Sequence, residues 1–158
     1  MADTVRHVPS DGWMSDVPDW LALKDRALAV AAEGVTIADA RAPGRPLIYV
    51  NEGFERMTGY PATEVLGHNC RFLQGPDTDA VAVAEIRAAL VEGRECLVEI
   101  FNYRKDGTTF WNRLSITPVR EPSGEVTHFI GIQSDVTVRR QAEDGLRRSM
   151  EAMRTLSG

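Results

Sequence analysis

Alternation of apolar and polar residues is clearest between positions 95 and 135, where three segments carry it. They read ECLVEIFNYR, TTFWNRLSITPVR and EVTHFIGIQSD, and the turn sequences KDG and EPSG separate them. Because a period of two places successive side chains on opposite faces of a sheet, this pattern predicts three antiparallel strands joined as a meander. Upstream, the short runs GVTIADA and PLIYV flank the turn-rich RAPGRP and predict a hairpin.

Helical signals occupy the segments around these strands. The Ala- and Leu-rich stretch 19–33 predicts a first helix that stops at Gly34, a residue type suited to the end of a helix. Asn51 can cap a short helix over EGFERMTG, and Pro61 fits the first turn of another over PATEVLG.

A longer helix is predicted over 80–91. GPDTD ahead of it supplies capping side chains, and Gly93 closes it. Four residues are expected on or near its apolar face: Val81, Ile86, Ala89 and Leu90. The predicted layout is strands, small helices, one longer helix and three further strands.

The two ends of the chain differ from this middle part. Residues 1–17 mix Asp, Ser, Pro and Gly without periodicity and are expected to form a mobile arm before the helix of 18–33. The core is assigned to 34–136. Residues 137–158 predict an amphipathic helix, which either folds back on its own sheet or pairs with another molecule. Its apolar residues lie three or four positions apart: Val138, Ala142, Leu146, Met150, Met153 and Leu156.

Composition and charge narrow the class of protein. The 158 residues, 43% of them hydrophobic, fit one globular domain. A net charge of −5 argues against a large nucleic-acid footprint. No apolar run approaches the roughly 18 residues that span a bilayer, and no secretion signal is present, so we expect a cytoplasmic protein with no membrane partner. Cys70 and Cys96 lack the spacing of a zinc site, so we expect two free thiols and no metal.

Three amide side chains lie where the strand pattern does not require them. Asn102 and Asn112 stand five residues on either side of Gly107 in the KDG turn, so the hairpin should bring them close together. Gln133 interrupts the otherwise apolar HFIGIQ. Each of them alone could point to water. Together they predict a planar heterocycle whose polar edge the amides bind, because an unpaired buried amide costs about 1 to 3 kcal/mol.

Two arginines suggest a phosphate. Arg71 follows Cys70 directly and Arg87 lies on the predicted longer helix, so both can converge on a dianion at the mouth of a pocket. The sequence has no glycine-rich dinucleotide loop, no P-loop and no paired catalytic carboxylates, so a second nucleotide half and an enzymatic activity are not expected.

The segments GHNCRFLQGPDTD, NYRKDGTTFWN and FIGIQSDVT, in this order, closely resemble the light-oxygen-voltage (LOV) family of blue-light receptors within the PAS fold. The resemblance extends from Gly34 to Thr137. It implies an α+β fold with a five-stranded antiparallel sheet, small helices on one face and a flanking helix at each end. It also implies FMN as a cofactor that is held noncovalently in the dark and attacked by the motif cysteine after blue light.

Carried across residue by residue, the resemblance implies that Cys70 forms the bond to flavin carbon C4a. The other contacts that it implies are Asn102, Asn112 and Gln133 with the polar ring edge, Asn69 and Gln74 with the ribityl chain, and Arg71 and Arg87 with the phosphate. The resemblance places Leu114 near the ring and Gly34 and Thr36 near the reactive centre. These three residues differ from those common among relatives, so the lifetime of the bond between Cys70 and the flavin is left open.

Signal output is the last expectation. Rotation of the Gln133 amide would answer the proton that flavin N5 gains and would pass the change to the C-terminal helix, in a homodimer formed by the flanking helices. Two alternatives stay open: a PAS module that binds a ligand or partner without photochemistry, and a flavoenzyme, for which we find no acid or base facing a substrate.

Overall fold

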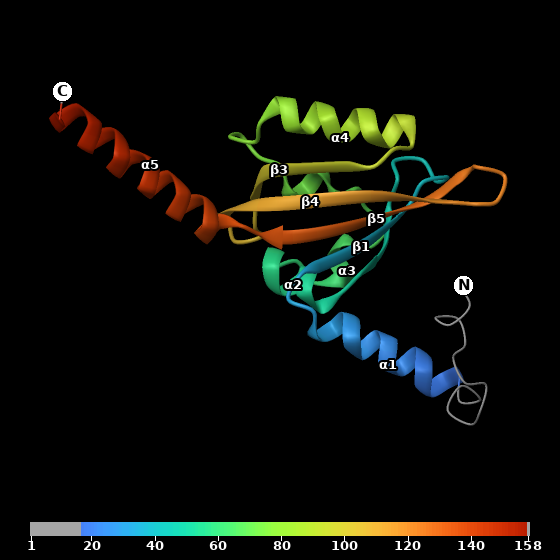
Figure 1. Cartoon of the computed structure of the whole chain (residues 1–158). Helices are drawn as coiled ribbons and strands as arrows, with labels where there is room; N and C mark the ends of the chain where they lie inside the picture. The colour runs from blue at the N-terminus through green and yellow to red at the C-terminus, as the bar shows by residue number, and fades with distance from the viewer. Residues whose placement is uncertain (1–16, 158) are drawn as a thin grey trace, which may run out of the picture.

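The computed structural model describes residues 17–157, which form one sheet, a set of covering helices and two flanking helices (Figure 1). The arm expected over 1–17 lies outside the described residues apart from Val17, which begins helix α1. Across the described part of the chain, no helix combines the length and the apolar character needed to cross a membrane.

Five antiparallel strands make up the sheet in the order β2-β1-β5-β4-β3. The hairpin is β1 (Gly34–Asp39) with β2 (Leu47–Val50), and the meander is β3 (Cys96–Tyr103), β4 (Thr109–Arg120) and β5 (Val126–Asp135). β1 pairs with β5, so the hairpin and the meander join at the centre of the sheet. The predicted α+β fold is confirmed.

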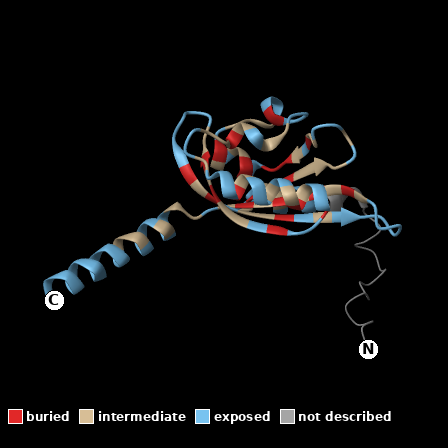
Figure 2. Ribbon diagram, turned by 90° about the horizontal axis from the view of Figure 1, so that it is seen from above, coloured by how far each residue is buried: buried red, intermediate tan, exposed pale blue. Residues whose placement is uncertain are grey.

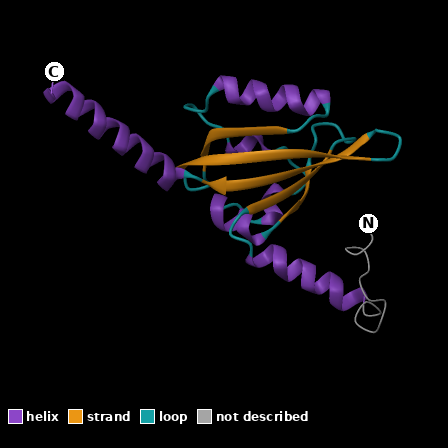
Figure 3. Ribbon diagram, viewed as in Figure 1, coloured by secondary structure: helices purple, strands orange, loops and turns teal. Residues whose placement is uncertain are grey.

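The small helices follow the predicted capping signals. Asn51 caps α2 (Glu52–Thr58) by accepting the amide hydrogen of Phe54, and Pro61 precedes α3 (Ala62–Val65). A 3₁₀ helix, η1 (Cys70–Leu73), leads to α4 (Ala80–Glu92), which ends at Gly93 in the left-handed conformation. Figure 3 shows these helices against the sheet, with α4 beside β3.

Two local predictions were wrong. The first helix, α1 (Val17–Val30), ends before Gly34, which is instead the first residue of β1. A Cβ atom at Gly34 would lie 2.8 Å from Gln133 Oε1 and 3.2 Å from the Cα atom of Phe54, so the space taken by the Gln133 amide and by α2 explains this glycine. On α4, Val81 is 74% exposed and Ala82 is buried in its place, because small side chains let the helix approach the sheet.

The C-terminal helix α5 (Thr137–Ser157) leaves the sheet and extends away from it (Figure 1). None of its described residues is buried, and exposed and intermediate colours alone follow it in Figure 2. The alternative in which this helix folds back on its own sheet is therefore wrong for this structure. The apolar residues that stay exposed include Val138, Leu146, Met150, Met153 and Leu156.

Candidate functional site

A cavity of about 320 Å³ lies between the sheet and its covering helices. Its size is in the range of small-molecule sites. All ten side chains that the sequence singled out for the reaction or for binding line it: Thr36, Asn69, Cys70, Arg71, Gln74, Arg87, Asn102, Asn112, Leu114 and Gln133. The structure therefore brings residues from strands, the 3₁₀ helix and α4 to one site.

The amides of β3, β4 and β5 form the polar part of this cavity. Asn112 Nδ2 donates to Asn102 Oδ1 at 3.0 Å, although the strand register makes the two residues diagonal neighbours and not direct partners. Among the described residues, Asn112 Oδ1 and Gln133 Oε1 are buried and have no hydrogen-bond partner. Such atoms are costly to bury, so they favour a ligand that offers hydrogen-bond donors.

Gln133 is held from one side by a residue on the neighbouring strand. Its Nε2 donates to Thr36 Oγ1 at 3.2 Å, and both side chains are buried. Gly131 pairs with Thr36, and a Cβ there would lie 2.5 Å from Thr36 Oγ1. The sequence analysis named Thr36 only by family position and missed this bond, because the β1–β5 register is not readable from either strand alone; the glycine within the strand was the available signal.

Cys70 is positioned by the residue before it. Asn69 Oδ1 accepts the amide hydrogen of Arg71 at 3.0 Å, and Asn69 Nδ2 donates to the carbonyl oxygen of Gly44 at 2.7 Å. These bonds fix the start of η1, where Cys70 lines the cavity. Desolvation by the surrounding protein raises the pKa of the Cys70 thiol to about 12. The thiol is therefore neutral at physiological pH.

The second cysteine has a different environment. Cys96 begins β3 and is buried in a cluster with Ala89, Ile116 and Phe129. It does not line the cavity. Both cysteines are free thiols, but only Cys70 faces the site.

Arg71 and Arg87 are exposed and line the same cavity. Among the described side chains of residues 22–157, neither guanidinium forms an ion pair or hydrogen bond, whereas Arg104 pairs with Asp135 and Arg140 with Glu99. Two unpaired arginines at one cavity can bind a dianion by forked hydrogen bonds. Gly44 and Arg45 also line the cavity, and the sequence analysis singled out neither of them.

Comparison with known proteins extends these observations. The family model described as PAS domain matches residues 33–138. Phototropin-2 of Oryza sativa subsp. japonica is 52% identical over 115 residues, which are 73% of this chain and 13% of that protein. The solved LOV domain from the blue-light activated histidine kinase of Erythrobacter litoralis EL346 is 45% identical and has a TM-score of 0.64. The match covers 66% of this chain and 95% of that domain.

The chain belongs to the LOV branch of the PAS domain family. A blue-light photoreceptor of Listeria monocytogenes serovar 1/2a is 45% identical to this LOV domain over 132 residues, which are 84% of the chain and 52% of the photoreceptor. The LOV chain thus spans about half of that relative and a much smaller part of phototropin-2. Two relatives are named as a blue-light-activated histidine kinase and a blue-light photoreceptor, and one solved LOV domain was described with a flavin analogue.

Proposed function

We propose that this LOV domain senses blue light through FMN, which, when bound, absorbs the light and then accepts the Cys70 sulfur at its carbon C4a in a reversible bond. The observation that best supports the proposal is the presence of the Cys70 thiol and two unpaired amide oxygens, on Asn112 and Gln133, in one cavity. A flavin ring has both a carbon that a thiol can attack and a polar edge that amides can bind.

The lining supplies a partner for each part of FMN. Asn102, Asn112 and Gln133 would hold the polar edge of the ring, and the Asn112 oxygen is free to accept from a ring N–H. Leu114 would contact the apolar part of the ring. Asn69 and Gln74 would contact the ribityl chain, and Arg71 and Arg87 would bind the phosphate.

The neutral thiol explains why the reaction needs light. A thiol with a pKa near 12 is almost entirely protonated at neutral pH and is a poor nucleophile in the dark. With flavin bound, Cys70 would give up its S–H proton to flavin N5 as its sulfur bonds to C4a. Reversal would return the proton to the sulfur, so no external oxidant or reductant is required.

Gln133 is the residue we propose as the relay. Its amide can present either a donor or an acceptor to N5, so protonation of N5 favours a rotated amide. Rotation would exchange the bond between Gln133 Nε2 and Thr36 Oγ1 for a contact of opposite polarity. Rotation would therefore alter side-chain hydrogen bonds on both β5, which carries Gln133, and β1, which carries Thr36.

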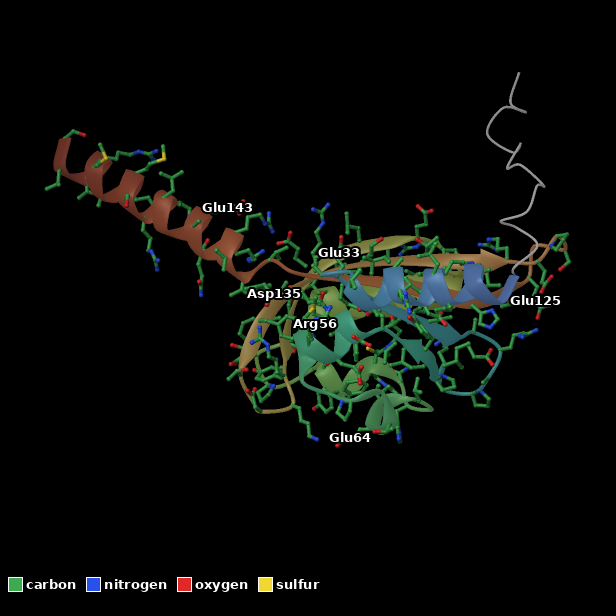
Figure 4. All side chains as sticks on the ribbon, turned by 90° about the horizontal axis from the view of Figure 1, so that it is seen from below. Glu33, Arg56, Glu64, Glu125, Asp135 and Glu143 are labelled. Atoms are coloured by element: carbon green, nitrogen blue, oxygen red, sulfur yellow. The ribbon has the colours of Figure 1, made fainter. Side chains whose placement is uncertain are left out.

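The route outward begins at the next residue. Ser134 Oγ donates to Glu33 Oε2 at 2.9 Å, and Figure 4 shows Glu33 and Asp135 at the end of the sheet where β5 passes into α5. Glu33 lies three residues after α1 and Ser134 three residues before α5, so this hydrogen bond links the segments that lead to the two flanking helices, next to Gln133. We propose that the signal passes from Gln133 to α1 and α5, in a homodimer that these helices form.

Charge bears on the kind of partner. With a net charge of −5, the domain is better suited to act through protein contacts than on nucleic acid or an anionic membrane surface. We propose that it does so in the cytoplasm.

An absorption spectrum of the purified full chain before and after blue light tests the proposal. The expected result is a yellow protein whose flavin band bleaches and recovers in the dark, with FMN identified in the extract by chromatography. A colourless protein, or a flavin that does not bleach, would favour a PAS module without photochemistry.

A further inference from the structure

We infer that Arg45 is a third phosphate-binding residue at this cavity and makes it selective for phosphorylated flavins. The inference rests on the proposed binding of FMN. Arg45 lies in the connection between β1 and β2 and lines the cavity together with Arg71 and Arg87. The three arginines come from three separate parts of the chain: the β1–β2 connection, η1 and α4.

The backbone on both sides of Arg45 is held to the rest of the site. The carbonyl oxygen of Gly44 accepts from Asn69 Nδ2 at 2.7 Å, and that of Pro46 accepts from the amide of Asp39 at 2.9 Å. The first of these bonds ties the connection to the residue that caps η1, where Cys70 and Arg71 lie. Arg45 is thus fixed relative to the segment that carries Arg71.

The conformation of Arg45 is unusual for its residue type. Its φ is 49°, and within residues 17–157 it is the only residue other than glycine with a positive φ. Glycine, asparagine and aspartate are the common occupants of this left-handed region. Backbone conformations of this kind cluster at ligand sites, where the surrounding structure maintains them. A long cationic side chain at such a position therefore points to a function at the cavity.

The charges around the cavity support the same function. In the part of the chain with described side chains, no ion pair or hydrogen bond engages the guanidinium of Arg45, Arg71 or Arg87, while Arg94 and Arg104 are paired with acids. Three unpaired cations lining one cavity of a chain with net charge −5 match a phosphate monoester, which has about two negative charges and three acceptor oxygens. Riboflavin offers no such partner, so all three cations would stay uncompensated around it.

Binding of FMN and riboflavin to the flavin-free full chain tests the role of Arg45. The main variant is Arg45→Asn, because asparagine tolerates the left-handed backbone, and Arg45→Lys keeps the charge without the fork. We expect Arg45→Asn to raise the Kd of FMN roughly 10- to 100-fold and to leave that of riboflavin within about twofold, the size expected for a lost charge-assisted hydrogen bond. Arg45→Lys should fall between wild type and Arg45→Asn.

Arg113→Gln is the matched control, since it removes the same charge from an arginine that is exposed on β4 and does not line the cavity. It should change neither Kd. If the wild type binds and bleaches FMN but Arg45→Asn leaves both Kd values unchanged, the role of Arg45 is overturned. Equal losses for both flavins would also overturn it and would assign Arg45 to the shape of the connection. A wild-type chain that binds neither flavin would overturn the proposed function itself.

Discussion

The environment of Cys70 decides the chemistry at the scale of single residues. Its thiol lines the cavity at the start of η1, and burial holds its pKa near 12, well above the ordinary value. The neighbouring Arg71 also lines this cavity, yet the thiol is less acidic than an ordinary cysteine. Cys70 is therefore a protonated thiol, unlike the thiolate of a cysteine-dependent enzyme, and in the proposed function the excited flavin would supply the missing reactivity.

This pKa predicts how light-driven bleaching depends on pH. Below about pH 10 the thiol is almost fully protonated, so the initial bleaching rate at constant light intensity should be nearly flat from pH 6 to 10. A thiolate mechanism with an ordinary cysteine would instead give a rate that rises through about pH 8.5. Absorbance followed during constant illumination in a series of buffers measures the bleaching rate. A rate that rises through about pH 8.5 would contradict a neutral thiol.

Arg71 and Arg87 give a second prediction at this scale. Replacing either by Ala should weaken FMN much more than riboflavin, because a charge-assisted bond to phosphate is worth about 1.5 to 3 kcal/mol. Fluorescence titration of both flavins measures the two affinities. Equal losses for FMN and riboflavin would mean that these arginines serve the fold and not the phosphate.

Among the secondary-structure elements, α5 has a defined attachment to the sheet. Trp111 on β4 donates its backbone amide hydrogen to Thr137 Oγ1 at 2.9 Å, and the guanidinium of Arg140 lies 3.7 Å from the centre of the Trp111 ring. Glu99 on β3 accepts from both Arg139 and Arg140. Trp111 is next to Asn112, which lines the cavity, so one strand contacts the site on one face and the attachment of α5 on the other.

Glu99→Gln should loosen this attachment. The hydrogen bonds from Arg140 and Arg139 lower the pKa of Glu99, so the attachment is present above the ordinary glutamate pKa of about 4.3 and is lost as the pH falls through the lowered value. Hydrogen exchange of the amides at the start of α5 should therefore be faster in Glu99→Gln at pH 7. In the wild type, these amides should exchange faster than the intrinsic pH dependence of exchange predicts only under acid conditions, where Glu99 is protonated.

Glu143→Gln is the control, because Glu143 pairs with Arg139 within α5 and is labelled on that helix in Figure 4. Its exchange should match that of the wild type. If Glu99→Gln behaves like this control, the ion pairs do not hold the helix.

The same scale shows what the sequence could predict. Alternation and turn residues were sufficient for the meander, and the capping residues Asn51 and Gly93 marked helix ends, because these signals are local. Gly34 was misassigned because its need for glycine comes from Gln133, on a strand far along the chain. The bond from Gln133 to Thr36 depends on the same long-range register.

The site shows the same division between local and long-range information. Seven of the ten lining residues that were named occur in the three short motifs, and Thr36, Arg87 and Leu114 were named by their family positions or predicted elements. Arg45 was not named, because it joins the cavity only through the folded β1–β2 connection. The direction of α5 was also open, since an amphipathic pattern does not state which surface covers the helix.

For the whole molecule, the exposed apolar residues of α5 and the hydrogen bond from Ser134 to Glu33, which links the segments leading to the two flanking helices, indicate where output would arise. We expect a light-dependent shift between helix arrangements in a homodimer. A coupling of about 1 to 3 kcal/mol is sufficient for such a shift.

Gln133→Leu tests this output. Leucine cannot exchange hydrogen bonds with N5, so the variant should still bleach but should lose most of the light-induced change in small-angle scattering. A chain truncated at Val138 should dimerise less than the full chain. If Gln133→Leu responds as strongly as the wild type, or if truncation leaves the dimer intact, the signal leaves the core by another route.

The central claim, a light-driven bond between Cys70 and the flavin, is tested most directly by the absorption spectrum of Cys70→Ala before and after blue light. Cys96→Ala serves as the matched control, because Cys96 is a buried free thiol that does not line the cavity. The account predicts that Cys70→Ala retains its flavin and loses reversible bleaching, whereas Cys96→Ala bleaches and recovers like the wild type. Reversible bleaching of Cys70→Ala with the spectrum of a sulfur-bonded flavin would contradict the account.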